Sequence, residues 1–189
     1  MTTVYFIRHS ESDHNVTDDR SRPLTEKGTV NCALVTGYLR DKEIDVIVSS
    51  PYKRSVDTIS EFAESVGLPI ITIEDFRERE NAWVEDSRVW QSFSEKQWSD
   101  FTYKISGGEC LAEVQKRNID ALNGVLENYK NMNIVIGTHG TALSTIINHY
   151  DKSYGYIDFM NMVNLTPWVA KMTFKDQEIV EIEKVNLFN

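Results

Sequence analysis

Short apolar runs alternate with amphipathic segments along most of this chain. A continuous run of four to six apolar residues is typical of a buried strand, and apolar residues spaced three and four apart indicate a helix. The runs that predict strands are Thr3–Ile7, Asp45–Val48, Ile70–Ile73 and Asn133–Gly137. The segments that predict helices are Thr25–Arg40, Lys53–Val66, Glu109–Tyr129 and Thr141 to about Tyr150. In the first of these helices, we expect Ala33, Leu34, Gly37 and Tyr38 to share the face toward the core.

The end of the chain has a different pattern. Trp168–Phe174 and Glu178–Val185 flank the polar stretch Lys175-Asp176-Gln177, which predicts an antiparallel hairpin. Before it, strands alternate with helices, and this order implies βαβ units with helices on both faces of a sheet. The predicted fold class is therefore α/β, a three-layer α/β/α sandwich around a mostly parallel central sheet.

One segment, from about 74 to 108, fits neither pattern. We interpret it as an insertion, or lid, over the sheet of a single domain that spans residues 1–189. Trp83, Trp90 and Trp98 lie in it at spacings of seven and eight. That spacing favours a helix that packs an aromatic stripe on the core, and the alternative is a hydrophobic wall for the organic part of a substrate.

Composition and charge narrow the classes of partner. The formal net charge of −9 argues against nonspecific binding to nucleic acid, which requires a cationic face. No apolar run approaches a membrane span, and the chain leads from Met1 straight into a strand rather than a signal peptide. Cys32 and Cys110 belong to no CxxC pattern and are expected to be reduced thiols. We therefore expect a cytoplasmic protein that acts on a small molecule, with no nucleic-acid or membrane partner.

Polar residues gather where three of the predicted strands end. The groups are Arg8-His9-Ser10-Glu11, then Ser49-Ser50-Pro51 with Arg54 in the helix that follows, and Thr138-His139-Gly140-Thr141. In an open α/β sheet, the carboxyl ends of parallel strands form the edge where ligands bind. We therefore expect two histidines and two arginines, from separate parts of the sequence, to meet in one crevice.

This combination of side chains suits a phosphate. Arginine presents paired donors to anionic oxygens and keeps its charge, and helices that start after the second and fourth strands add free N–H groups. The surrounding cations should also lower the pKa of each histidine, leaving His9 neutral and nucleophilic. The chain has no Walker-type loop, no carboxylate pair spaced for magnesium and no HExxH spacing, so neither a metal nor another cofactor is expected.

At these residues the chain resembles the histidine phosphatase superfamily, which includes the cofactor-dependent phosphoglycerate mutases. Six blocks match the family's motifs in the right order, from about Val4 to Thr145. They are Arg8-His9-Ser10-Glu11-Ser12 followed by Asn15, Pro23-Leu24-Thr25-Glu26-Lys27-Gly28, Ser49-Ser50-Pro51 with Arg54 and Thr58, Phe76-Arg77-Glu78, Gly107-Gly108-Glu109-Cys110 with Val114 and Arg117, and Val135-Ile136-Gly137-Thr138-His139-Gly140. The resemblance implies a phosphoglycerate mutase-like fold.

The resemblance also implies a role for each site residue. His9 would attack phosphorus and form a phosphohistidine, and Glu78 would protonate the leaving alcohol and then activate water. Arg8, Arg54 and His139 would hold the phosphate oxygens. Further hydrogen bonds would come from Asn15 and from Gly140, just before the helix that follows the fourth strand.

Some assignments remain open in the sequence. Glu80 is the main rival of Glu78 as proton donor, and Asn15 is also a common turn residue. His14 and His149 are interpreted as surface or helix residues. Three positions depart from the family pattern: Ser10 and Ala82 replace glycines and Cys110 replaces serine. Ser10 could crowd the backbone close to the phosphate.

Two functions compete with phosphomonoester hydrolysis. In the family's mutases, a longer insertion carries several basic residues, whereas here Arg88, Lys96 and Lys104 are scattered among aromatic residues. A short, aromatic insertion favours water as the phosphoryl acceptor, so we expect a phosphatase. The alternatives are a bisphosphate-dependent phosphoglycerate mutase and a phospholigand-binding module without turnover. The chain is expected to be a monomer or a homodimer.

Overall fold

A twisted sheet forms the centre of the computed structural model, which describes residues 1–80 and 87–188. Its strands lie in the order β3-β2-β4-β1-β5-β6. Their bounds are Thr2–Arg8 for β1, Val46–Ser49 for β2, Ile70–Thr72 for β3, Asn133–Thr138 for β4, Trp168–Lys175 for β5 and Glu178–Val185 for β6. The first four strands pair in parallel, and β5 and β6 pair antiparallel, so the mostly parallel sheet and the C-terminal hairpin are confirmed.

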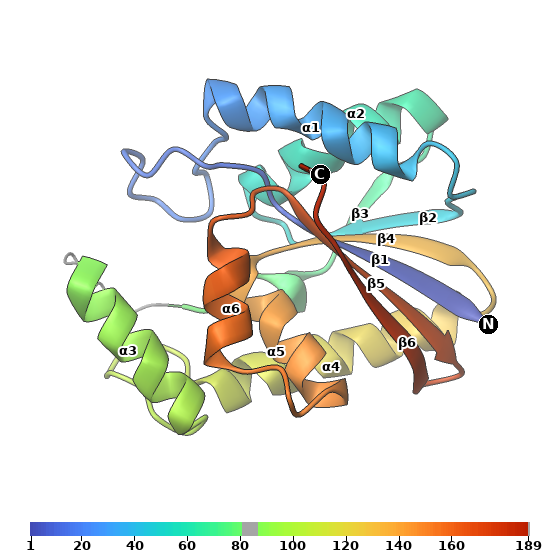
Figure 1. Cartoon of the computed structure of the whole chain (residues 1–189). Coiled ribbons are helices and arrows are strands. Elements are labelled where there is room, and N and C mark those ends of the chain that lie inside the picture. The colour runs from blue at the N-terminus through green and yellow to red at the C-terminus, as the bar shows by residue number, and fades with distance from the viewer. Residues whose placement is uncertain (81–86, 189) are drawn as a thin grey trace.

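Helices cover both faces of the sheet, as the three-layer prediction requires. They are α1 (Glu26–Leu39), α2 (Lys53–Val66), α3 (Ser87–Ser99), α4 (Leu111–Asn128), α5 (Gly140–Tyr150) and α6 (Tyr156–Val163). Figure 1 shows α1 and α2 above the sheet and α4, α5 and α6 below it, with α3 outside α6. One apolar cluster fills each side, around Ile7 and Leu39 on the first and around Phe6 and Ile146 on the second.

The strand register brings the predicted tips together. Arg8 at the end of β1 lies beside Thr138 of β4, and Ser49 at the end of β2 lies beside Gly137. The three strands therefore end at the same edge, with His9, Ser50 and His139 one residue beyond. This alignment places the start of α2 and the start of α5 at that edge as well.

The sequence prediction for the face of α1 was wrong. The buried residues of this helix are Gly28, Cys32, Val35, Thr36 and Leu39. Ala33 and Gly37 are exposed, and Leu34 and Tyr38 are only partly buried. The true stripe has the spacing of a helix face, but it includes glycine, cysteine and threonine, which a count of apolar residues does not register.

Two other parts of the chain are more regular than the sequence indicated. The segment from 74 to 108 contains a 3₁₀ turn, Glu74–Phe76, and the 13-residue helix α3. Helix α6 was not predicted, because it has only eight residues, too few for a periodic pattern to identify a helix. Within the described residues, no helix is both long enough and apolar enough to cross a bilayer.

Gly28 holds the segment after β1 against α1, and this contact leads to a stability prediction. A Cβ atom at Gly28 would lie 2.1 Å from the Glu11 carbonyl oxygen, so Gly28→Ala must push the two backbones apart. We expect a loss of about 1–3 kcal/mol in the free energy of unfolding, measured by urea denaturation. Gly37→Ala is the matched control in the same helix, because nothing lies within 4 Å of its Cβ position. It should stabilise the protein by about 0.5–1 kcal/mol, and equal effects of the two changes would contradict this account.

Candidate active site

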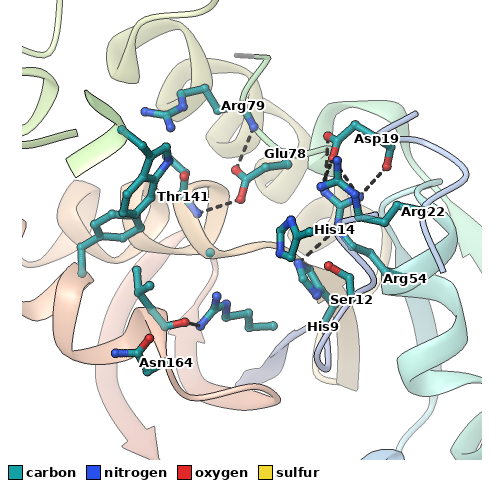
Figure 2. Close-up of a pocket in the computed structure, with 15 residues that line it drawn as sticks. His9, Ser12, His14, Asp19, Arg22, Arg54, Glu78, Arg79, Thr141 and Asn164 are labelled. Atoms are coloured by element: carbon teal, nitrogen blue, oxygen red, sulfur yellow. Dashed lines mark hydrogen bonds and ion pairs between the residues drawn. The ribbon is translucent and has the colours of Figure 1, made fainter. Parts of the chain in front are cut away.

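A pocket of about 400 Å³ opens at the edge where β1, β2 and β4 end. The segment after β1, the first turns of α2 and α5, residues 78–79, and helices α3 and α6 contribute to its wall. The lining residues are Arg8, His9, Ser12, His14, Asp19, Arg22, Arg54, Glu78, Arg79, Trp90, Gly140, Thr141, Phe159, Val163 and Asn164. In Figure 2, Glu78 lies on one side of the pocket, and His9, His14 and Arg54 lie on the other.

His9 directly follows β1, and its ring orientation is set by the backbone. Its Nδ1 lies 2.6 Å from the Ser10 carbonyl oxygen, which can only accept, so Nδ1 carries the proton and Nε2 carries the lone pair. Burial, together with the Arg54 and Arg8 guanidiniums, holds the pKa of His9 well below its usual value. The ring is therefore neutral at pH 7 and presents an unprotonated Nε2.

His139 lies at the start of α5, and its ring is next to the ring of His9. The two ring centroids are 5.2 Å apart, and His139 is completely buried. Its Nε2 lies 2.7 Å from the Ser50 hydroxyl oxygen, and its Nδ1 has no hydrogen-bond partner. An unpaired buried ring nitrogen is costly, which is consistent with a ligand atom taking that position.

Arg54 comes from the first turn of α2 and contacts the His9 ring. Its Nε donates to His9 Nε2 at 3.2 Å, while Nη1 donates to the Asp19 carbonyl oxygen and lies 3.2 Å from the Asp19 carboxylate. The Arg54 side chain is only 3% exposed, whereas that of Asp19 is 42% exposed. The Asp19 carboxylate that pairs with Arg54 is thus partly solvated. The Arg54 guanidinium lines the pocket.

The C-terminal end of α6 fixes the position of the Arg8 side chain. Its Nη1 donates to the carbonyl oxygens of Met162, Val163 and Leu165 at 2.6–2.9 Å, and its Nε has no partner. Burial lowers the pKa of Arg8 to about 10, which still leaves it charged at pH 7. The three carbonyls orient the guanidinium without neutralising it. A Cβ atom on Gly140 would approach Arg8 Nε to 3.3 Å, so a larger residue here would require the Arg8 side chain to shift slightly.

Glu78 faces the pocket, and Glu80 does not line it. The Glu78 carboxylate accepts hydrogen bonds from the backbone N–H groups of Thr141 and Ala142, at 3.0 and 3.1 Å, and from that of Arg79. The N-terminal turn of α5 therefore holds this carboxylate. Glu80 is 59% exposed and lies near Arg77 on the surface. Geometry thus favours Glu78 over Glu80.

Asn15 is not where the sequence analysis placed it. It is exposed and does not line the pocket, and its side-chain amide donates to the Asp13 carboxylate at 2.8 Å. Asp13 also accepts from the Asn15 backbone N–H, so a local turn uses the amide that was expected to bind phosphate. His14 is exposed, as the surface interpretation expected, and it also lines the pocket.

Several other lining residues were missed. Ser12, Asp19 and Arg22 lie in the segment after β1, whose path the sequence did not predict. Arg79 is 3% exposed, and its guanidinium lies 5.3 Å from the centre of the Phe93 ring. The charged residues next to Glu78 indicate that a further charged side chain could reach the site. Only the fold shows that Arg79 is the one that lines the pocket.

The departure at Ser10 does not crowd the pocket. Its side chain is completely buried, and the hydroxyl donates to the Gly28 carbonyl oxygen at 2.7 Å. Its backbone N–H donates to the Thr58 hydroxyl. Ser10 therefore points toward α1 and ties the segment after β1 to that helix, away from the nucleophilic face of His9.

Both interpretations of the tryptophans apply in part. Trp98 packs on Phe159 and Tyr154 with ring centroids 5.6 and 6.2 Å apart, so α3 does pack an aromatic stripe. Trp90 also contacts Phe159, and both line the pocket. Trp83 and Ala82 lie outside the described residues. In the described part of the chain, no group of three or more His, Cys, Asp or Glu residues is placed to hold a metal ion.

The buried, neutral state of His139 predicts how stability depends on pH. Burial lowers its pKa well below the usual value, so the unfolded chain binds more protons at acidic pH. The stability contributed by neutral His139 is present above about pH 6.5 and is lost as the pH falls below it, by up to about 1.4 kcal/mol per pH unit. Urea denaturation between pH 8 and 5 should show this loss. His139→Gln should show a shallower slope, and an unchanged slope would contradict the assignment.

The chain matches a family model, "Histidine phosphatase superfamily (branch 1)", over residues 4–180. It is 28% identical over 168 residues to "Uncharacterized phosphatase PhoE" of Bacillus subtilis, which covers 87% of this chain and 85% of that protein. It is 30% identical over 159 residues to "Probable phosphoglycerate mutase GpmB" of Yersinia pestis, covering 78% of this chain and 74% of the relative.

Solved structures share this fold along almost the whole chain. A phosphoserine phosphatase from Entamoeba histolytica, in complex with 3-phosphoglyceric acid, superposes with a TM-score of 0.78 at 21% identity and covers 100% of both chains. Bacillus stearothermophilus YhfR superposes with a TM-score of 0.77 at 22% identity and covers 95% of each chain. The arrangement of sheet and helices seen here is therefore one that other proteins also adopt.

Proposed function

Because the chain belongs to the histidine phosphatase superfamily, we propose that it hydrolyses phosphomonoesters through a phosphohistidine on His9, with Glu78 as the proton donor and acceptor. One observation carries the proposal. The unprotonated Nε2 of His9, the unpartnered Nε of Arg8 and the unpartnered Nδ1 of His139 gather at the edge where β1 and β4 end. These groups are a nucleophile, one unused guanidinium N–H and one unused imidazole nitrogen, and together they suit one phosphate.

In the first step, His9 Nε2 attacks phosphorus, and the bond to the ester oxygen breaks. The attack leaves positive charge on the imidazole. The Ser10 carbonyl oxygen stabilises this charge, because it accepts a hydrogen bond from the Nδ1–H group of His9. Without substrate, the Arg54 Nε–H donates to the Nε2 lone pair that must attack phosphorus. When substrate binds, a phosphate oxygen must accept this hydrogen bond in place of His9. Arg8 and His139 supply the other donors for the charge that spreads over the phosphoryl oxygens.

Glu78 completes both steps of the proposed reaction. It gives its proton to the departing alkoxide, then takes one from the water that attacks the phosphohistidine, so that inorganic phosphate leaves and His9 is restored. The amides of Thr141 and Ala142 stabilise the carboxylate needed in the second step.

The wall opposite the histidines suits a small phosphorylated organic molecule. Trp90, Phe159 and Val163 provide apolar contact, while Asn164 and Arg79 add polar groups. We propose that such a phosphomonoester is the substrate and that water is the acceptor. The fitting test is a panel of phosphomonoesters, assayed for inorganic phosphate with and without a chelator. Release that resists the chelator supports the proposal, whereas phosphoryl transfer that requires a bisphosphate primer would identify a mutase, and tight phosphate binding without turnover would identify a binding module.

A further inference from the structure

Arg117 of α4 joins the segment that carries Glu78 to the body of the protein. It does not line the pocket, and its side chain is 11% exposed. Its Nη1 donates to the carbonyl oxygens of Asp75 and Arg77, both at 2.8 Å, and its Nη2 donates to the Glu78 carbonyl oxygen at 3.1 Å. A single guanidinium therefore binds three backbone carbonyls along four consecutive residues.

Glu109, just before α4, orients that guanidinium. Its carboxylate accepts from Arg117 Nε at 2.8 Å and Nη2 at 2.9 Å, in the two-pronged geometry that arginine favours. It also accepts from Arg77 Nη2 and from the Glu80 backbone N–H, both at 2.9 Å. Burial alone would raise the pKa of Glu109, but the hydrogen bonds from Arg117 and Glu80 outweigh it, and the net pKa is lowered. The Glu109 carboxylate is therefore charged, and it binds the segment on both sides of Glu78, at Arg77 and at Glu80.

The segment needs this support because it belongs to no sheet or helix. After the 3₁₀ turn ends at Phe76, residues 77–80 have no strand or helix assignment, so regular backbone pairing does not fix their path. The direction of the Glu78 side chain depends on that path. A small error in the placement of a catalytic group costs far more rate than stability.

We propose that Arg117, held by Glu109, is a positioning residue that aims the Glu78 carboxyl at the leaving group. The inference rests on the proposed function, in which Glu78 transfers the proton. It gives a role to the motif Gly107-Gly108-Glu109 with Arg117, which contributes no side chain to the pocket lining. The guanidinium fork is essential to the role, because lysine keeps the charge but cannot bridge three carbonyls and a carboxylate.

Proton donation matters most for esters with poor leaving groups, and this gives the test. The variant Arg117→Lys is compared with the unmutated protein by rapid-quench measurement of phosphohistidine formation. The two substrates are p-nitrophenyl phosphate, which needs little protonation to leave, and an alkyl phosphate, which needs full protonation. We expect the rate with the alkyl ester to fall about 10- to 100-fold, since general acid catalysis supplies about 10²–10⁴-fold. The rate with the aryl ester should change by less than about threefold.

Matched variants separate positioning from general damage. Lys116→Gln removes the neighbouring cation of α4, which pairs with exposed Asp120 at 2.5 Å, and should leave both rates unchanged. Glu109→Gln should reproduce the ester-selective loss, and it replaces Arg117→Lys if that variant does not fold. In a Glu78→Gln background, Arg117→Lys should cause no further loss with the alkyl ester, because the group that it positions is gone.

The outcomes distinguish this inference from the function on which it rests. Equal losses with both esters, or an additive loss in the double variant, would mean that Arg117 only supports the fold, and would overturn the inference alone. Failure of the unmutated protein to form a phosphoenzyme with either ester would overturn the proposed function and the inference together.

Discussion

Replacing His9 with alanine should reduce hydrolysis of any phosphomonoester substrate by at least about 10⁴-fold, because the change removes the proposed nucleophile. The Nε2 atom that presents a lone pair to the pocket is fixed by the Nδ1 contact with the Ser10 carbonyl oxygen. His139 is not a substitute nucleophile, because its Nε2 is bound to the Ser50 hydroxyl oxygen and its Nδ1 is the atom proposed to donate to the phosphate. The measurement is initial-rate release of inorganic phosphate by purified protein.

The control for this change is His149→Ala. His149 is an exposed histidine of α5, on the same polypeptide but outside the pocket lining, and its loss should leave the rate unchanged. The His9→Ala protein should still bind inorganic phosphate, because Arg8, Arg54 and His139 remain. Turnover within tenfold of the unmutated rate after the His9 change would mean that another group attacks phosphorus.

The second large effect is expected at Arg54. Arg54→Met should lower kcat by about 10³-fold, because the change removes both a charged donor to the phosphoryl oxygens and the contact that holds the His9 ring. Arg54→Lys should recover only part of this loss, since an ammonium group cannot serve the phosphate and His9 at once. Arg20→Met is the matched control. Arg20 lies over the Tyr52 ring, 5.3 Å from its centre, but it is exposed and pairs with Glu74.

The pH profile of the Arg54→Met protein gives an independent check. Burial comes first among the causes that lower the pKa of His9, and the Arg54 charge comes next. Removing that charge should raise the pKa of His9, so a larger fraction of the ring becomes protonated at mildly acidic pH. The acidic limb of kcat/KM should therefore shift to higher pH in the variant. A shift to lower pH, or none, would contradict the proposed coupling between Arg54 and His9.

The sequence predicted well that the proposed catalytic groups would meet, because a simple rule connects strand ends to one edge of a sheet. Arg8, His9 and His139 each stand at or just after a buried parallel strand, and the register of β1 and β4 determines where they lie. Arg54 follows from the same rule through the short connection between β2 and α2. These four placements need no knowledge of loops.

Loop residues were predicted less well, because their positions depend on local competition for hydrogen bonds. Asn15 has the right chemistry for phosphate, yet Asp13 captures its side chain in a turn. The carbonyls that hold Arg8 come from the end of α6, more than 150 residues away, and no local pattern indicates such a contact. The role proposed for Arg117 was hidden for the same reason, since three of its partners are backbone carbonyls, which every sequence contains.

The most direct test of the central claim is to identify the covalent intermediate. The protein is mixed with a phosphomonoester substrate, quenched in alkali within milliseconds, and digested for mass spectrometry, which locates any phosphorylated residue. We predict a phosphoryl group on His9 that forms and decays at rates compatible with turnover and is lost on exposure to acid. Steady turnover with a phosphoryl group on a different residue, or with no phosphoenzyme at any time point, would contradict the account.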